Sequence, residues 1–262
     1  MLAAYRRGRA REPFEGSRLS RRSDLVKHRV QSGNLRVVDI SPDHVRAALF
    51  YVIAFIVSVA VHEFGHAFVA DRLGDRIPRL QGRLTLSPLA HIDPIGTLAV
   101  PILGALAGLP LFAWGKPVQT NPANYTRRFS MRTGSMLVAA AGPFMNLVLA
   151  FVGSVVIVVL TKAGVLPHKL QIALIGYVVL LNISLMIFNM IPLGPLDGAA
   201  VLAGLLPPSM ERINELNRKY GMLVLLFLFL SPSMGLPGLA FILRPVYALV
   251  GAWMGVFGLG VA

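Results

Sequence analysis

Residues Ala47–Ala70 read AALFYVIAFIVSVAVHEFGHAFVA, and this stretch decides the fold. A helix of this length extends about 36 Å at about 1.5 Å per residue, whereas the hydrocarbon core of a membrane is about 30 Å thick. The stretch is therefore long enough to cross a bilayer. Its clearly polar side chains are Ser58, His62, Glu63 and His66, so the predicted membrane helix carries ionisable groups inside an apolar region.

The three ionisable side chains of this helix point to metal chemistry. One such group at the membrane centre costs about 2.5–3.5 kcal/mol on insertion scales, so a membrane segment with several of them is a candidate functional site. His62 and His66 are four residues apart, which places both rings on one helix face, one turn apart. Two neutral imidazoles in this arrangement can hold Zn²⁺, and Glu63 beside them can transfer protons during hydrolysis.

The composition of the chain agrees with a membrane protein. Hydrophobic residues make up 55% of the 262 residues and charged residues 14%, and the mean hydropathy is +0.66. Soluble domains average about 45–50% and about 25% for the same two classes. The chain has no cysteine, which excludes disulfides, thiolate zinc ligands and cysteine nucleophiles. We therefore expect an all-α polytopic integral membrane protein, built as a helical bundle, in which any zinc ligand must be histidine, aspartate or glutamate.

The N-terminal region is basic. Residues 1–46 contain eleven lysines and arginines against five acidic residues. No aromatic interleaving or nucleic-acid motif accompanies this charge, so we expect no nucleic-acid partner. A basic segment beside an apolar helix favours contact with the anionic surface of a lipid bilayer instead. We interpret residues 1–45 as a partly disordered tail.

The rest of the chain divides into apolar runs and polar connections. Arg79–Leu86 alternates polar and apolar side chains over much of its length, which predicts a small β-hairpin at the membrane surface. Ile92–Ala113 is apolar but interrupted by proline and glycine, so it either spans the membrane or re-enters it. Counting the loop charges favours a span, but the sequence does not decide between the two. We expect a core over residues 46–206 and, after the polar connector Pro207–Tyr220, one or two further membrane segments within residues 207–262. Three other apolar runs are predicted to enter the membrane: Thr133–Thr161, Leu170–Ile191 and Met222–Ala262.

A carboxylate follows the run Leu170–Ile191. Phe188–Gly198 reads FNMIPLGPLDG, and Pro192 and Pro195 prevent a regular helix there. Irregular backbone at membrane depth is tolerated where it is buried in protein or lines a wet cavity. Asp197 is either the N-cap of a following helix or the third ligand of a zinc ion held by the two histidines.

A further polar side chain lies within the run Thr133–Thr161. Ala141–Asn146 reads AGPFMN, in which Gly142-Pro143 loosens the helix and Asn146 offers an amide. Such an amide can donate to a peptide carbonyl or to a developing oxyanion. It can equally bond a neighbouring helix, as polar side chains in membrane helices do. The residues alone leave both interpretations of Asn146 open.

Together these elements resemble the intramembrane site-2 metalloproteases. The resemblance rests, in chain order, on His62-Glu63-Phe64-Gly65-His66, on Ala141-Gly142-Pro143 with Asn146, and on Asn189 through Asp197-Gly198. Gly82–Pro88 and His91–Thr97 are similar to a compact bacterial branch without a PDZ domain. The resemblance implies a three-helix metalloprotease core, a zinc ion below the membrane surface, a multi-pass protein of a bacterial cell membrane, and proteolysis of transmembrane or membrane-anchored proteins.

The resemblance also implies roles for individual residues. His62, His66 and Asp197 would be the zinc ligands, and Glu63 the general base and acid. Asn146 would assist catalysis and, with Asn189, help to hold the substrate backbone. The expected hairpin, with Arg83 and Leu84, would receive the substrate as an added strand.

Two other classes of function compete with proteolysis. A non-catalytic membrane scaffold of the same fold would not need Glu63 together with all three candidate ligands. A metal transporter would line an ion path with histidine and carboxylate side chains, and it usually needs several acids, of which this chain has few. The substrate and the oligomeric state cannot be read from the sequence.

Overall fold

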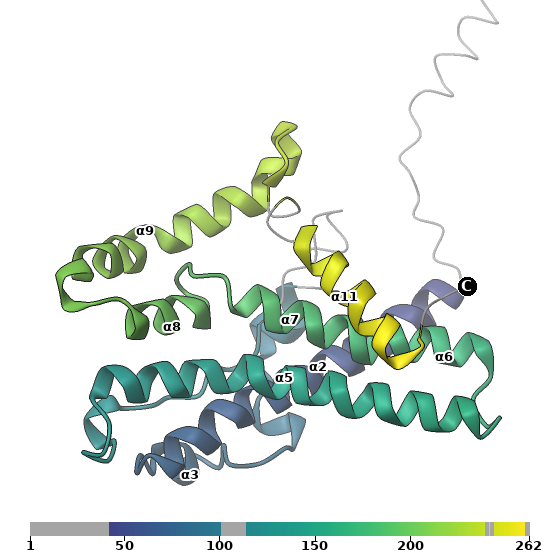
Figure 1. The fold of residues 1–262 in the computed structure, drawn as a ribbon, viewed down its shortest axis with the longest axis horizontal. Coiled ribbons are helices and arrows are strands. Elements are labelled where there is room, and N and C mark those ends of the chain that lie inside the picture. Colours follow the sequence, from purple (N-terminus) through teal and green to yellow (C-terminus); the bar gives the residue numbers. More distant parts are fainter. Residues whose placement is uncertain (1–41, 101–113, 239–240, 242–243, 260–262) are drawn as a thin grey trace, which may run out of the picture. The chain divides into compact units, whose positions relative to one another are not determined.

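The computed structural model describes residues 42–100, 114–238, 241 and 244–259. The chain divides after Arg46 into two units, and apart from residues 42–46 the features below lie in the second, Ala47–Ala262. Most of the expected tail, and residues 101–113 of the segment that either spans or re-enters the membrane, lie outside the described residues. The described residues form helices and connections with no β-strand among them (Figure 1), which confirms an all-helical fold for this part of the chain.

The described helices differ widely in length, and short turns of helix join the long ones. The α-helices are α2 (Pro42–Arg72), α3 (Ile77–Leu80), α5 (Met131–Lys162), α6 (His168–Leu174), α7 (Leu181–Asn189), α8 (Asp197–Leu205), α9 (Glu211–Leu230) and α11 (Arg244–Phe257). The π-helical turns are η2 (Pro94–Ala99) and η4 (Ile175–Leu180). The 3₁₀ turns are η1 (Pro88–Ala90), η3 (Pro122–Asn124), η5 (Pro208–Met210) and η6 (Ser231–Met234).

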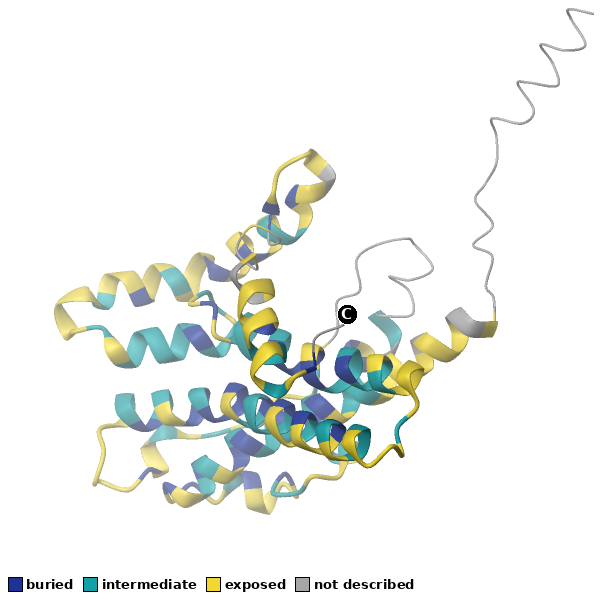
Figure 2. Ribbon diagram, turned by 45° about the vertical axis from the view of Figure 1, so that its right-hand side comes forward, coloured by how far each residue is buried: buried dark blue, intermediate teal, exposed yellow. Residues whose placement is uncertain are grey.

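Three helical segments among the described residues are long and apolar enough to cross a membrane. They are Val45–Arg72, Met131–Lys162 and His168–Asn189, and the last joins α6, η4 and α7. Large apolar side chains such as Phe144 and Val159 are exposed on these segments, which suits contact with lipid. Exposed residues recur along the long helices in Figure 2. These segments coincide with three of the predicted apolar runs, and the chain is an integral membrane protein.

Helix α5 is the centre of the packed unit. Its first turn is capped by Ser130, whose Oγ accepts a hydrogen bond from Thr133 N at 3.0 Å. It packs against α7 and η4 on one side, where Gly153 leaves no room for a side chain beside Val178, and against α8 near its N-terminal half. One apolar core cluster is formed by Ala150, Ile157, Ile175, Val179, Ile183, Val250 and Leu259.

Helices α8 and α9 follow each other as a helical pair that begins beside the N-terminal half of α5. Arg132 at the start of α5 donates from Nε to Ala203 O in the last turn of α8. Helix α9 packs on α8 and already begins at Glu211, so most of the predicted polar connector Pro207–Tyr220 is helical. A polar segment need not be a loop: the first half of α9 is charged and the second half apolar, within one helix.

The predicted β-hairpin over Arg79–Leu86 was wrong. Helix α3 occupies the start of this segment, because Pro78 in its first turn favours helical backbone. Arg83 N donates to Pro78 O at 2.8 Å, and Gly82 has a φ of +67°, which together close a tight local turn. Backbone hydrogen bonds are thus made within the segment, and no partner strand is present among the residues that the structure describes.

The alternation that suggested a strand has another cause. Arg79 pairs with Asp71, and its Nε and Nη2 donate to the two carboxylate oxygens at 2.8 and 2.7 Å. Arg83 is buried, and its Nη1 donates to the carbonyl oxygens of Ala90 and Lys116. The polar side chains therefore reach separate acceptors instead of sharing one face of a strand.

Candidate metal centre

Two helices approach each other closely where the site forms. Gly65 of α2 faces α5, and a Cβ atom at this position would lie 2.6 Å from Ala141 O. Only glycine permits this approach, since real Cβ atoms essentially never come within 3.0 Å of another atom. The contact presses the face of α2 that carries His62 and His66 onto α5.

The Nδ1 atoms of both imidazoles are held by α5. His66 Nδ1 donates to the backbone oxygen of Val138 at 2.7 Å, and His62 Nδ1 donates to Asn146 Oδ1 at 2.6 Å. The Asn146 amide is oriented by its own donations from Nδ2, so the oxygen faces His62. In the neutral rings the proton therefore sits on Nδ1, and each Nε2 keeps its lone pair.

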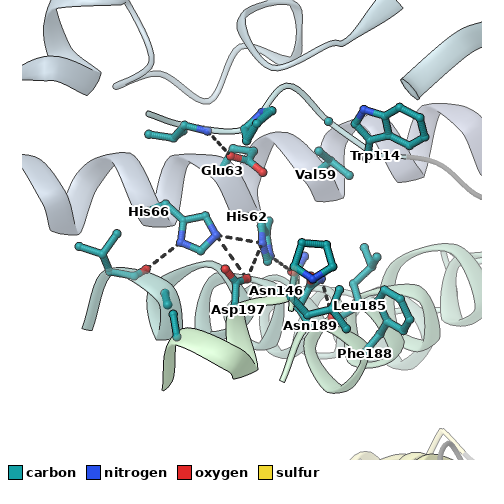
Figure 3. A pocket seen from close by; sticks show the side chains of 18 of the residues that line it. Val59, His62, Glu63, His66, Trp114, Asn146, Leu185, Phe188, Asn189 and Asp197 are labelled. Atoms are coloured by element: carbon teal, nitrogen blue, oxygen red, sulfur yellow. Dashed lines mark hydrogen bonds and ion pairs between the residues drawn. The ribbon is translucent and has the colours of Figure 1, made fainter. Parts of the chain in front are cut away.

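The two Nε2 atoms converge on a carboxylate (Figure 3). They lie 3.1 Å apart, and Asp197 Oδ2 is 3.1 Å from that of His62 and 3.4 Å from that of His66. Three hydrogen-bond acceptors thus face one another, an arrangement that a cation between them stabilises. Two imidazole nitrogens and one carboxylate oxygen are the donor set of many catalytic zinc sites, so these residues fit Zn²⁺.

Asp197 reaches this place as the first residue of α8 and not as its cap. The N-cap position is held by Leu196, and no side chain caps the helix. The carboxylate is directed toward the imidazoles instead, across from the α2 face that carries them. Of the two interpretations that the sequence left open for Asp197, the geometry favours the ligand.

Glu63 lies next to the imidazoles and has its own anchor. One ligand atom from each of His62, Glu63 and His66 lies within 4.8 Å of the others. Glu63 Oε2 also accepts a hydrogen bond from Val118 N at 2.9 Å, in the non-helical segment between residues 114 and 121. The backbone of this segment therefore fixes the carboxylate beside the candidate metal position, within reach of a water molecule there.

A cavity of about 750 Å³ opens at the site. Its polar end is formed by His62, Glu63, His66, Asn189 and Asp197. Its apolar wall includes Phe55, Val59, Leu185, Phe188, Met222 and Leu225, drawn from α2, α7 and α9. Polar chemistry is thus placed beside a surface that accepts apolar side chains.

Asn146 has no exposed surface. Its Nδ2 donates to Ser58 O at 3.2 Å and to Asn182 Oδ1 at 2.8 Å, while its oxygen accepts from His62. In this arrangement it orients the imidazole of His62. The predicted contact of Asn146 with a substrate carbonyl stays a prediction, and such a contact would require Asn146 to give up one of these bonds.

The expected substrate-binding residues lie in different surroundings. Asn189 lines the cavity, and its Nδ2 donates to Leu185 O at 3.0 Å. Arg83 is buried on backbone carbonyls, and Leu84 is half-buried. Neither of these two lines the cavity where the structure describes it, so their contact with substrate stays a prediction.

Asn182, which was not predicted from the sequence, is part of this network. Asn182 is 1% exposed and donates from Nδ2 to Ser58 Oγ at 3.0 Å and to Val178 O at 2.7 Å. Its Oδ1 accepts from Asn146, which in turn holds His62. The available signal was an amide inside an otherwise apolar membrane run, since a buried polar group there needs a partner.

Replacement of Asn182 by leucine is expected to lower zinc affinity by about 10–100-fold, the range for changes around metal-binding histidines. Leucine has the branched shape of asparagine, although it is larger, and it removes one of the two acceptors of Asn146 Nδ2, so the amide is held less firmly toward His62. Zinc affinity measured by chelator competition checks this. Tyr177→Phe is the control, because it removes from the same membrane span a hydroxyl that donates to Ala47 O. Equal zinc affinity in Asn182→Leu and Tyr177→Phe would show that Asn182 does not act on His62 through Asn146.

Comparison with known proteins places this geometry in context. The model of peptidase family M50 matches residues 50–171, which include His62, Glu63, His66 and Asn146. The chain is 36% identical over 189 residues to YwhC of Bacillus subtilis, covering 70% of this chain and 81% of the relative. It is 32% identical over 186 residues to Rip2 of Mycobacterium tuberculosis, covering 70% and 67%. Both relatives are described as candidate zinc metalloproteases. No solved structure matches the chain.

Proposed function

We propose that this chain, which belongs to peptidase family M50, is a zinc-dependent endopeptidase. Its substrates would be transmembrane or membrane-anchored proteins. The observation that carries the proposal is the convergence of His62 Nε2, His66 Nε2 and Asp197 Oδ2, with Glu63 beside them. A structural zinc site would be closed by four protein ligands, whereas a catalytic site keeps a position open. The cavity at the three atoms supports the catalytic type.

Different residues of the chain would bind the metal ion and transfer protons during hydrolysis. A bound zinc ion would supply Lewis acidity, which makes water a nucleophile near neutral pH and polarises the scissile carbonyl. His62, His66 and Asp197 would hold that ion. Glu63 accepts a proton from the attacking water and returns a proton to the leaving amine. The bond from Val118 N keeps the Glu63 carboxylate in place for both transfers.

The position of the site supports membrane segments as substrates. His62 and His66 lie within the candidate span Val45–Arg72, on the face turned toward α5. The apolar wall of the cavity can take the side chains of a membrane segment, and the polar end gives water a place beside the peptide bond. A substrate helix has its carbonyls in hydrogen bonds, so we infer that it unwinds before it reaches Glu63.

Cleavage of a transmembrane substrate in proteoliposomes tests the proposal. We expect the purified protein to contain about one zinc ion, to cut within or at the edge of the membrane segment, and to stop cutting when zinc is chelated. Mass spectrometry of the product ends locates the cut, and Asp197→Ala serves as the inactive control with low zinc content. Cuts confined to soluble loops far from the membrane would refute an intramembrane activity, and full zinc content in Asp197→Ala would remove Asp197 from the ligand set.

A further inference from the structure

The backbone segment that carries Asp197 is held by a helix outside the expected core. The segment runs from the end of α7 to the start of α8. Asn217 of α9 accepts a hydrogen bond at Oδ1 from Gly194 N at 3.0 Å and donates from Nδ2 to Pro192 O at 3.1 Å. One amide side chain thus bridges a donor and an acceptor two residues apart, in a segment whose prolines lack N–H groups.

The same segment has no space to shift toward α9. Gly221 lies one turn after Asn217, and a Cβ atom there would be 2.7 Å from both Gly194 N and Gly194 O. On the other side, a Cβ atom at Gly198 would collide with the backbone oxygens of Met190 and Ile191. The segment is therefore packed between the backbone of α9 and the first turn of α8, immediately before the Asp197 carboxylate.

Helix α9 also reaches the cavity. Met222 and Leu225 line it, one and four residues after Gly221. The helix therefore contacts both the space available to the substrate and the segment that presents Asp197. A rotation or shift of α9 would break the hydrogen bonds of Asn217 to Pro192 and Gly194. The same movement would displace Met222 and Leu225 from the cavity wall.

We propose that Asn217 is a positioning residue, which sets the place of the Asp197 carboxylate relative to His62 and His66 through the backbone of Pro192–Gly194. The inference rests on the proposed function, because it takes Asp197 as a metal ligand. Asparagine suits the role since its amide pairs with a backbone N–H and a backbone carbonyl at once, as a neighbouring strand would. Helix α9 is accordingly part of the metal site's support.

Replacement of Asn217 by alanine tests this with two measurements that do not depend on cleavage. We expect zinc affinity, measured by chelator competition, to fall about 10-fold, at the lower end of the effect of groups around metal ligands. We also expect the visible absorption of the Co²⁺-substituted protein to change, because it reports the arrangement of ligands around the metal. Circular dichroism shows whether the variant keeps its helices.

Two further variants make the test specific. Asn217→Asp keeps the size and the acceptor for Gly194 N but places a second oxygen against Pro192 O, where the two acceptors repel, so we expect a loss of affinity in the same direction. If Asn217→Ala does not fold, the affinity of Asn217→Asp still tests whether Asn217 positions Asp197. Arg218→Ala is the matched control on the neighbouring position, where the guanidinium bonds Glu211 of its own helix at 3.2 Å, and we expect wild-type affinity and absorption.

Failure of this inference can be told apart from failure of the proposed function. A wild-type protein that binds no zinc would overturn the function. A wild-type protein that binds zinc and cleaves, with Asn217→Ala and Asn217→Asp both matching its affinity and its Co²⁺ absorption, would overturn the role of Asn217 alone.

Discussion

Replacement of Glu63 by glutamine is expected to lower the rate of peptide cleavage by about 10²–10⁴-fold, the usual contribution of a general acid–base group. Glutamine keeps the shape of the side chain, and its oxygen can still accept the hydrogen bond from Val118 N. It cannot accept a proton from water. Because His62, His66 and Asp197 are unchanged, zinc content should stay at the wild-type level, which metal analysis of the purified variant checks.

The control for this variant is Glu215→Gln, on the exposed face of α9, which should cleave at the wild-type rate. Two outcomes for Glu63→Gln would count against the proposed role. A wild-type rate would assign the proton transfer to another group. Loss of zinc would make Glu63 a ligand instead of a base.

Replacement of Gly142 by alanine is expected to abolish zinc binding and to reduce cleavage by more than about 100-fold, beyond the effect of most changes around a ligand. A Cβ atom at this position would lie 2.7 Å from His62 Nε2 and closer still to His66 Nε2. It would fill space beside both metal-facing nitrogens or push the imidazoles apart. Equilibrium zinc binding and cleavage of a transmembrane substrate measure the two effects.

Gly176→Ala provides the matched control for this small change. Gly176 also lies in a candidate membrane span, but a Cβ atom there would meet nothing within 4 Å. The control should bind zinc and cleave as the wild type does. If Gly142→Ala also retained zinc, the imidazoles would have to occupy other positions than those in Figure 3.

The placement of the proposed zinc ligands was predictable where the pattern is local. His62 and His66 are one helical turn apart, so the period of the helix places both rings on one face before any tertiary contact is known. The three membrane helices followed from apolar length. The sequence alone could not choose between Asp197 as ligand and as cap, because the distance to the histidines is set by the packing of α8 against α5.

The remaining differences have physical causes. Arg79–Leu86 alternates because its arginines serve distant acceptors, and an alternation this short does not specify a partner strand. Residues 211–220 were predicted only as a polar connector, because the prediction relied on apolar length. Apolar length does not detect a helix whose first half is polar. Asn217 bonds backbone atoms of a remote segment, and no sequence pattern encodes such a pair.

The two imidazoles are held by acceptors of different kinds, so mutation affects the hydrogen bonds of His62 and His66 differently. The acceptor of His66 Nδ1 is a main-chain oxygen at Val138, which every amino acid at that position would supply. The acceptor of His62 Nδ1 belongs to the side chain of Asn146, which a single codon change removes. Natural variation and directed evolution can therefore adjust the basicity and aim of one histidine while the other stays constant. Libraries intended to shift metal preference should be directed to Asn146, Asn182 and Ser58, since substitutions at Val138 leave the hydrogen bond to His66 in place.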